Sequence, residues 1–376
     1  MRARAAGLGL AAALAVAACA SARVPEDPAP HLAVPRGFAV NTYAEGLQGA
    51  RFMAVGPDGA IYLTLTRSGR VVALPDANRD GRADRVVTVA EGLDLPHGIA
   101  FHDGALYVAE TGRVIRYPGY RGGRAGRPEV VVGHLPAGGG HFTRTIAFGP
   151  RDGMLYVSVG SSCNICEERD RRRAAVSRYR ADGSQGIVFA RGLRNAVGLA
   201  FNPVNGELWA TSNERDMLGD DLPPEEIVDV LVEGGDYGWP YCYGNRVPNP
   251  EYNDRARCAG TIPPALTDTA HSAPLGCAFY TGSAFPAEYR NDYFVCYHGS
   301  WNRSRPTGYK VVRVRVQGGR PTAIEPFLTG FLPHPGEPLG RPVDVVTAPD
   351  GSLLVSDDFG GRIFRVRWLG VPRRRS

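Results

Sequence analysis

One pattern of hydrophobic and polar positions recurs along the chain: a turn pair ending in glycine, followed by a run in which apolar side chains alternate with others. The clear copies begin at Asp58-Gly59, Asp103-Gly104, Asp152-Gly153, Asn205-Gly206 and Asp350-Gly351, and a degenerate copy at Asn291-Asp292 lacks the glycine. Alternation of period two predicts strands, and Asp-Gly or Asn-Gly between strands predicts tight hairpins. The first four copies are 45, 49 and 53 residues apart, which is typical of the blades of a β-propeller.

The pattern therefore predicts an all-β, six-bladed β-propeller with little helix. Each copy is followed by a second apolar strand, for example over residues 113–117, 310–316 and 362–368. The strand expected over residues 37–43 should pair with the one over residues 362–368, because that pairing closes the ring and removes a sheet edge. A pair of β-sandwiches is the alternative fold, but it does not explain so regular a spacing.

Four longer segments interrupt the repeat, at residues 138–142, 163–173, 215–226 and 241–272. We expect these insertions to gather at one face, where they wall a pocket at the central channel and carry the function. The 48 glycines and 30 prolines recur between apolar runs, which indicates many tight turns in one globular body. The net charge of +5 comes from dispersed arginines, so it does not indicate a nucleic-acid partner.

The N-terminus has the features of an export signal. Residues 1–19 combine basic residues with an apolar stretch too short to span a membrane, and they end in Val16-Ala17-Ala18-Cys19. This segment resembles a bacterial lipoprotein signal, which implies lipidation of Cys19 and a place on the periplasmic side of the cell envelope. An ordinary signal peptide cut near Ala20 is the alternative. Residues 20–36 then form a Pro/Ala-rich tether, residues 37–369 the propeller, and residues 370–376 a basic tail.

Six cysteines follow Cys19, and an even number in an oxidising compartment favours disulfides. Sequence proximity predicts the pairs Cys163–Cys166, Cys242–Cys258 and Cys277–Cys296. Cys163 and Cys166 form a Cys-x-x-Cys motif, for which a redox-active or zinc-binding pair is the alternative. Glu167 stands where haem attachment would require histidine.

Three polar segments fall where the blades would meet the pocket: Gly140-His141-Phe142-Thr143-Arg144, Gly192-Leu193-Arg194-Asn195, and the stretch from His298 to Lys310. Lys310 is the single lysine among 43 basic residues. Lysine is a compact ammonium that arginine does not replace at a site needing a small point charge, so Lys310 is itself a candidate site residue.

Several motifs make the chain recognisable, and the match extends from about residue 37 to residue 368. They are Gly198-Leu-Ala-Phe201, Asn213-Glu214-Arg215-Asp216, Gly238-Trp239-Pro240, Phe279-Tyr280-Thr-Gly282, His298-Gly-Ser-Trp301-Asn302-Arg303 and Gly308-Tyr309-Lys310-Val311. With them the chain resembles the glucose/sorbosone dehydrogenase family, and most closely its sorbosone dehydrogenase-like branch. The resemblance implies a six-bladed quinoprotein that uses pyrroloquinoline quinone (PQQ).

The resemblance also implies roles for individual residues. PQQ is a flat o-quinone with three carboxylates, so its site needs cations, for which Lys310 and Arg341 match. Arg194 and Asn195 match the pair that hydrogen-bonds the quinone oxygens and polarises the carbon accepting hydride. His141 matches the general base, and the neutral pKa of imidazole suits that role.

Two positions depart from the soluble glucose dehydrogenases of that family. Val197 stands where they carry glutamine, and Val343 where they carry a second arginine. Substrate contacts or carboxylate pairing must therefore differ, which argues against glucose itself as the substrate. Arg144, Arg303 or Arg305 are the candidates to compensate for the missing cation.

Calcium is the expected metal, because it binds carbonyl and carboxylate oxygens and would bridge an anionic quinone to the protein. The calcium loop of the family aligns with Arg215-Asp216, where backbone carbonyls would be the ligands, and Asp220, Asp221, Glu225 and Glu226 lie nearby in sequence.

A second candidate for calcium is Asp76-x-Asn78-x-Asp80-Gly81-x-x-Asp84, which resembles the first nine positions of an EF-hand loop. It has Val87 where the bidentate glutamate belongs, and a polar hairpin tip is its alternative reading.

These observations predict an exported, lipid-anchored dehydrogenase that oxidises an aldose or related sugar aldehyde and passes electrons to a respiratory acceptor. A calcium-dependent lactonase on the same fold is a second hypothesis, but no matching set of carboxylate and asparagine ligands is evident. A surface binding propeller that has lost cofactor affinity is a third hypothesis.

Overall fold

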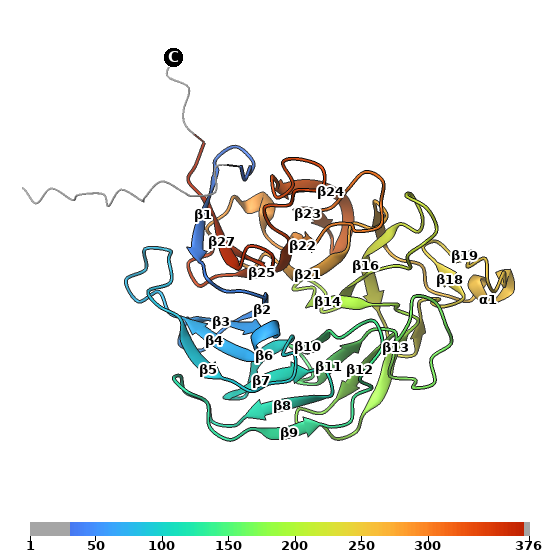
Figure 1. Cartoon of the computed structure of the whole chain (residues 1–376), viewed down its shortest axis with the longest axis horizontal. Coiled ribbons are helices and arrows are strands. Elements are labelled where there is room, and N and C mark those ends of the chain that lie inside the picture. The colour runs from blue at the N-terminus through green and yellow to red at the C-terminus, as the bar shows by residue number, and fades with distance from the viewer. Residues whose placement is uncertain (1–30, 372–376) are drawn as a thin grey trace, which may run out of the picture.

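A computed structural model describes residues 31–371 as a ring of six small sheets (Figure 1). The predicted signal with Cys19, most of the tether and residues 372–376 lie outside the described residues. From the inner to the outer strand, the blades are β2 (Ala50–Val55), β3 (Ile61–Leu65), β4 (Arg70–Leu74), β5 (Val87–Ala90); β6 (Ile99–His102), β7 (Ala105–Glu110), β8 (Arg113–Tyr117), β9 (Glu129–Val132); β10 (Arg144–Phe148), β11 (Leu155–Val159), β12 (Ala175–Tyr179), β13 (Ile187–Arg191); β14 (Ala196–Phe201), β15 (Leu208–Ser212), β16 (Glu225–Leu231), β20 (Leu266–Asp268); β21 (Pro274–Phe279), β22 (Tyr293–Tyr297), β23 (Lys310–Gln317), β24 (Arg320–Leu328); and β25 (Pro342–Thr347), β26 (Leu353–Asp357), β27 (Arg362–Trp368), β1 (Phe38–Ala44).

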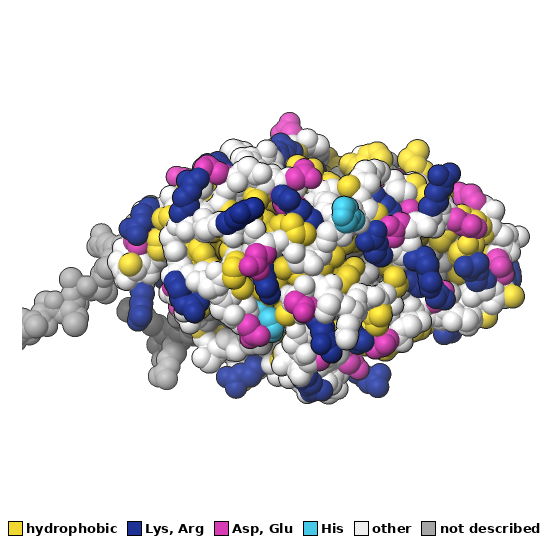
Figure 2. All heavy atoms as spheres, turned by 90° about the horizontal axis from the view of Figure 1, so that it is seen from below, with side chains coloured by type: hydrophobic (Ala, Val, Ile, Leu, Met, Phe, Trp, Pro, Cys, Tyr) yellow, Lys and Arg dark blue, Asp and Glu magenta, His cyan; other side chains and the backbone are white. Residues whose placement is uncertain are grey.

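The predicted six-bladed propeller is confirmed, and helix is sparse. The α-helix of the described chain, α1 (Arg255–Ala259), lies with β18 (Cys242–Tyr243) and β19 (Val247–Pro248) at the periphery of the ring (Figure 1). The short strand β17 (Gly235–Asp236) adds to the outer edge of the third blade, parallel to β13. None of the helices in residues 31–371 is long and apolar enough to span a bilayer. Figure 2 shows one side of the molecule, on which basic and acidic side chains are interspersed.

The repeated turn has the same place in every blade, between the innermost strand and the second strand. Its glycine adopts a left-handed conformation, as at Gly59 and Gly351 with φ of 80°. The degenerate copy reaches the same region through Asn291 at φ 66°. Asparagine tolerates this conformation better than most residues, which explains why the glycine is dispensable there.

The ring is closed by the N-terminal strand, as predicted. β1 pairs antiparallel with β27, with Phe38 opposite Trp368 and Val40 opposite Val366. The Phe38 ring packs edge-on against Phe285, with 4.7 Å between ring centroids, and also contacts Tyr289, Phe327 and Trp368. β1 therefore connects the last blade to the aromatic core of the fifth blade.

The segment just before β1 packs on the same core. Ala33 forms two backbone hydrogen bonds with Thr329, and Leu32 and Val34 lie against the buried cluster that contains Phe38. The described end of the predicted tether, residues 31–36, therefore belongs to the propeller.

Two of the three predicted disulfides are confirmed, Cys163–Cys166 and Cys242–Cys258. The predicted Cys277–Cys296 pair is wrong, because both thiols are free and buried. Cys277 lies opposite Val295 across the β21–β22 ladder, so Cys296 is one residue out of register. Successive residues of a strand point to opposite faces, and the two thiols accordingly join different core clusters.

The antiparallel blades sort the loops onto two faces. Loops that join the first to the second strand, or the third to the fourth, lie on one face, which we call the turn face. Loops that join the second to the third strand, or one blade to the next, lie on the other, which we call the site face. Of the four long segments, 138–142, 163–173 and 215–226 lie on the site face, whereas much of 241–272 forms the peripheral excursion with α1.

Replacing Phe38 by alanine should lower the free energy of unfolding by about 3 kcal/mol or more, because truncating a buried phenylalanine costs roughly 3–5 kcal/mol. Urea denaturation followed by tryptophan fluorescence measures the change. The exposed neighbour Leu369, 61% accessible, provides the control, and L369A should change stability by less than about 0.5 kcal/mol. Equal losses in the two variants would contradict the closing role of Phe38.

Candidate active site

His141 lies on the site face, in the loop that enters β10, and its two ring nitrogens have different surroundings. Nδ1 lies 2.8 Å from the main-chain oxygen of Ser161, which can only accept a hydrogen bond. The proton of the neutral ring is therefore on Nδ1, and the lone pair is on Nε2. No hydrogen bond among the described residues involves Nε2, so this nitrogen is available to a substrate hydroxyl.

The electrostatic surroundings keep this imidazole neutral. Burial, followed by the positive charge of Arg194, lowers the pKa of His141 to about 4, and the charges of Arg173 and Arg144 act in the same direction. At neutral pH the ring is a deprotonated base, as general-base catalysis requires.

Two arginines hold the loop that carries His141. Arg144 is fully buried, and its Nη1 donates to the carbonyl oxygens of His141 at 3.0 Å and Thr143 at 2.7 Å. Arg173 donates to the carbonyl oxygens of Ala137 and Gly138. Burial lowers the pKa of Arg144 to about 10. Because its terminal nitrogens bind loop carbonyls, Arg144 is placed to shape the loop rather than to bind a carboxylate of a cofactor.

Arg194 occupies the turn before β14, and all five of its N–H donors are used within the protein. Nε and Nη2 bind Asn164, Nη2 also pairs with Asp216 at 3.0 Å, and Nη1 binds the carbonyl oxygens of Asn213 and Glu214. The predicted direct hydrogen bonds to quinone oxygens would require Arg194 to give up one of these partners. The structure places Arg194 as an organiser of the surrounding loops.

Asn195, the next residue, has the opposite character. Its Oδ1 is buried and has no hydrogen-bond partner among the described residues. Gly160 packs against both Asn195 and His141. A methyl group placed on Gly160 would come within 2.3 Å of Asn195 Oδ1 and within 2.8 Å of His141 Cβ, so these two side chains lie close together. Buried polar atoms are nearly always paired, so an unpaired amide beside a free imidazole nitrogen indicates a place for a polar ligand.

Lys310 and Arg341 are two cations of the site face without a carboxylate partner in the described chain. Lys310 begins β23, and its Nζ lies 5.6 Å from the centroid of the Tyr297 ring. Arg341 precedes β25 and donates to the carbonyl oxygens of His298 at 3.0 Å and Gly299 at 2.7 Å. Its guanidinium pairs with neither Asp344 nor Asp357, so its charge remains available to an anion.

The other predicted cations are engaged or exposed. Arg303 pairs with Asp221 and binds two main-chain oxygens, and Arg305 is exposed. The two valines that depart from the glucose dehydrogenases, Val197 and Val343, are fully buried in one apolar cluster with Leu275. They lie on the inner strands β14, β25 and β21, where they close the centre of the ring.

A chain of polar contacts on the site face, with an ion pair between Arg51 and Asp358 and a hydrogen bond between Asp358 and His298, was missed in the sequence. Asp358 accepts from Arg51 Nη1 at 2.9 Å and lies 2.9 Å from His298 Nε2. Burial raises the pKa of Asp358, but the hydrogen bond from His298 and the charges of His298 and Arg51 outweigh it and hold this pKa well below its usual range. The available signal was topological, since Asp358 follows β26 as His298 follows β22.

The structure brings Arg215 and Asp216 into the site with most of their polar atoms engaged. Arg215 forms a two-pronged ion pair with Glu251. The carboxylate of Asp216 binds Arg194 and Asn302, and its main-chain oxygen accepts from Asn164. No hydrogen bond among the described residues ends on the Arg215 carbonyl oxygen, so this is the predicted calcium ligand that is free to bind an ion.

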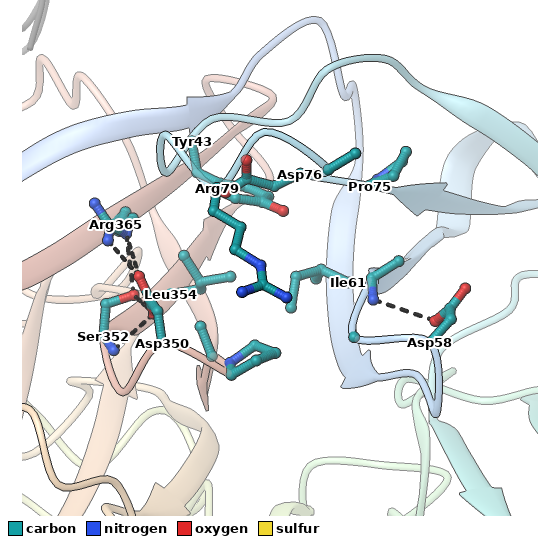
Figure 3. A pocket seen from close by; sticks show the side chains of 15 residues that line it. Tyr43, Asp58, Ile61, Pro75, Asp76, Arg79, Asp350, Ser352, Leu354 and Arg365 are labelled. Atoms are coloured by element: carbon teal, nitrogen blue, oxygen red, sulfur yellow. Dashed lines mark hydrogen bonds and ion pairs between the residues drawn. The ribbon is translucent and has the colours of Figure 1, made fainter. Parts of the chain in front are cut away.

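The second calcium candidate, residues 76–84, lies on the turn face, beside a cavity of about 500 Å³ into which Arg79 points (Figure 3). Asp76, Asp80 and Asp84 accept hydrogen bonds from backbone N–H groups of their own loop. Among residues 31–371, the metal-ligating side chains that lie within 4.8 Å of one another are those of Cys163, Cys166 and Glu168, and the residues of this loop are not among them. The two cysteines of that group form a disulfide. The loop over residues 76–84 therefore has the geometry of a polar hairpin tip.

This chain is similar to known proteins in both sequence and fold. A model of the TrAA12-like family matches residues 32–368. The chain is 32% identical to an uncharacterised protein of Borreliella burgdorferi over 351 residues, which cover 89% of this chain and 90% of that protein.

It is 26% identical to the pyrroloquinoline quinone-dependent pyranose dehydrogenase of Coprinopsis cinerea, over 90% of this chain but only 55% of that longer protein. The solved holo form of the PQQ domain of that pyranose dehydrogenase matches with a TM-score of 0.78 at 25% identity, over 91% of this chain and 98% of the domain. The resemblance seen in the sequence is thus confirmed at the level of PQQ-dependent sugar dehydrogenases, and the chain belongs to the TrAA12-like family.

Proposed function

We propose that this protein is a PQQ-dependent dehydrogenase that oxidises an aldose or a related, sorbosone-like sugar aldehyde. The observation that carries the proposal is the neighbourhood of His141: a neutral imidazole with a free Nε2 stands beside the unpaired Asn195 amide, on the same face as two cations without carboxylate partners. The named activity of the Coprinopsis relative supports it. Because this chain spans about half of that relative, substrate and acceptor are parts of the proposal.

The residues present fit the cofactor. PQQ is an anion with three carboxylates, and Lys310 and Arg341 are the cations that would hold them. The buried Oδ1 of Asn195 would accept a hydrogen bond from a hydroxyl of the quinone hydrate. After a side-chain flip, its amide nitrogen would instead donate to a quinone oxygen. When bound, the o-quinone would supply an electrophilic centre that takes two electrons from the substrate carbon.

The chain's own part in the reaction is to position and deprotonate the sugar. Nε2 of His141 takes the proton of the substrate hydroxyl, while Nδ1 stays bound to the Ser161 carbonyl, which fixes the plane of the ring. Arg194 and the other nearby cations stabilise the negative charge that develops on the substrate oxygen. The exposed aromatic residues Phe142, Trp301 and Phe359 lie in loops of the site face, and each is next in sequence to a polar residue.

The proposal includes calcium, for which the main-chain oxygen of Arg215 would be a ligand, and the ion would supply positive charge to an anionic cofactor. Export through the N-terminal signal and anchoring at Cys19 belong to the same proposal, because the N-terminal motif supports them. Electron transfer to a respiratory acceptor is included because the oxidation of a sugar requires an electron acceptor.

Titrating the cofactor-free protein with PQQ in excess calcium, and then adding a panel of aldoses with a reducible dye, tests the function as a whole. We expect saturable binding seen in the cofactor absorbance, followed by sugar-dependent dye reduction. Absence of binding would overturn the proposal in favour of a binding propeller or a calcium-dependent lactonase, and lactone hydrolysis assayed on the same sample separates these two.

Replacing His141 by glutamine should reduce kcat about 100-fold or more and spare PQQ binding, because a general base contributes roughly 10²- to 10⁴-fold. H102Q, which changes a histidine at the end of β6 near the turn face, is the matched control. Unchanged turnover in H141Q would refute the assignment of the base.

The same residue sets the pH dependence of the native enzyme. The neutral form of His141 is the active one, and its pKa is lowered to about 4, so activity should persist on the acid side and fall only as pH approaches that value. The acid limb of kcat/KM should therefore lie well below the value of about 6.5 expected for an ordinary histidine. A limb at or above pH 6.5 would contradict the proposed surroundings of the base.

Replacing Lys310 by alanine should raise the dissociation constant for PQQ about 10- to 100-fold, because a hydrogen bond to a charged group is worth roughly 1.5–3 kcal/mol. K310R should also weaken binding, since the planar fork does not reproduce a compact ammonium. R320A, at an exposed position on the same blade, is the control. Native affinity in K310A, measured by absorbance titration, would remove Lys310 from the cofactor site.

A further inference from the structure

Asn164 stands between the two bridged cysteines in the sequence and forms hydrogen bonds to Arg194, Asp216 and Trp239. Its Oδ1 accepts from Arg194 Nη2 at 3.0 Å and from the Asp216 backbone N–H at 2.8 Å. Its Nδ2 donates to the Asp216 carbonyl oxygen at 3.0 Å. Its own carbonyl oxygen accepts from Arg194 Nε at 3.1 Å and Trp239 Nε1 at 3.3 Å.

These contacts cross from one blade to the next. Asn164 lies in the β11–β12 loop of the third blade, whereas Arg194 enters β14 and Asp216 follows β15, both in the fourth blade. The side-chain amide of Asn164 both accepts from the main-chain N–H of Asp216 and donates to its carbonyl oxygen, as the main chain of a neighbouring strand would. Since Arg194 also pairs with the Asp216 carboxylate at 3.0 Å, the three residues form a closed network.

The Cys163–Cys166 disulfide holds this network in place. It closes the loop Cys163-Asn164-Ile165-Cys166 into a ring, which limits the orientations available to the Asn164 side chain and carbonyl. The same loop reaches the base, because Ser161 Oγ donates to the Cys163 carbonyl at 2.6 Å and lies 3.1 Å from His141 Nδ1. One short cross-linked loop therefore contacts both the His141 side and the Arg194 side of the site.

We propose that Asn164 is a positioning residue for the oxidation reaction: it fixes the Arg194 guanidinium and the Asp216 main chain relative to His141, and the Cys163–Cys166 disulfide fixes Asn164. The role in turnover rests on the proposed function, but the role in geometry does not. The alternative is a clamp that stabilises the fold and leaves the site unaffected.

The two roles differ in their effect on His141. The positive charge of Arg194 disfavours protonation of the imidazole, together with those of Arg173 and Arg144, which are held by other loops. If Asn164 positions Arg194, removing the amide lets this one charge move away while the other two stay. The pKa of His141 must then rise, whereas a loss of stability alone would leave it unchanged in the folded protein.

The first experiment uses the cofactor-free protein labelled with ¹³C in its histidine rings, and follows the His141 resonance, assigned with H141Q, against pH. In N164A the pKa should rise by about 1, as expected when a nearby like charge is removed. The double variant C163S/C166S should move it in the same direction. Asn202 is a buried asparagine on the turn face whose Nδ2 donates one hydrogen bond and whose Oδ1 accepts one. N202A is therefore the matched control and should leave the pKa of His141 unchanged.

The second experiment measures turnover with PQQ, calcium and the best sugar. N164A should lose about 100-fold in kcat, the order expected for a displacement of about 1 Å, and its acid limb should move to higher pH. N164D keeps the two acceptor contacts of Oδ1 and should recover part of kcat. Serine variants of the cysteines replace chemical reduction here, because thiols and phosphines also react with the quinone.

The outcomes are separable. A rise in the pKa of His141 in N164A supports the proposal even where wild-type protein oxidises no sugar, a result that would overturn only the proposed function. An unchanged pKa and acid limb in folded N164A would overturn the positioning role. Should N164A not fold, the C163S/C166S variant decides in the same way, because it leaves every side chain of the network in the chain.

Discussion

The antiparallel pairing of β1 with β27 is the constraint on which the remaining structure depends. It joins the two ends of the chain into the last blade and leaves the ring without a gap. Inside the ring, hydroxyl groups bind neighbouring blades together: Thr145 donates to the Val197 carbonyl oxygen at 2.5 Å, Thr211 to that of Leu275 at 2.7 Å, and Ser356 to that of Arg51 at 2.6 Å. These bonds fix the inner strands, and the inner strands fix where the loops of the site face emerge.

The site face uses buried arginines in place of regular secondary structure. Arg144, Arg173 and Arg194 bind the carbonyl oxygens of loops that no strand pairs, and so satisfy main-chain groups that would otherwise be buried without partners. The consequence is an excess of positive charge around His141. Burial and this charge together lower the pKa of His141 and keep the imidazole neutral, and the charge also favours an anionic ligand.

The residues that the resemblance to known quinoproteins nominates lie on one face of the ring, but their contacts in this structure suggest different roles for some of them. Lys310, Arg341 and Asn195 retain free charge or free hydrogen-bonding capacity, whereas Arg194 does not. Val197 and Val343 fill the centre of the ring with apolar side chains, so polar contacts to a substrate must come from the loops above them. The disulfide loop with Asn164 is one of those loops, and it hydrogen-bonds to two others.

The sequence by itself determined the fold and named the candidate site residues. The repeated turn and its spacing specified six blades, because a period-two pattern and a left-handed turn residue are local properties of the chain. Polar segments and the resemblance to known quinoproteins together named His141, Asn195, Lys310 and Arg341 as candidate site residues. Tertiary structure alone decided which atoms remain free: the engagement of all five Arg194 donors and the Arg51–Asp358–His298 chain join residues from different blades. The strand register that separates Cys277 from Cys296 could likewise not be predicted from the sequence, because proximity along the chain does not say to which face of a sheet a side chain points.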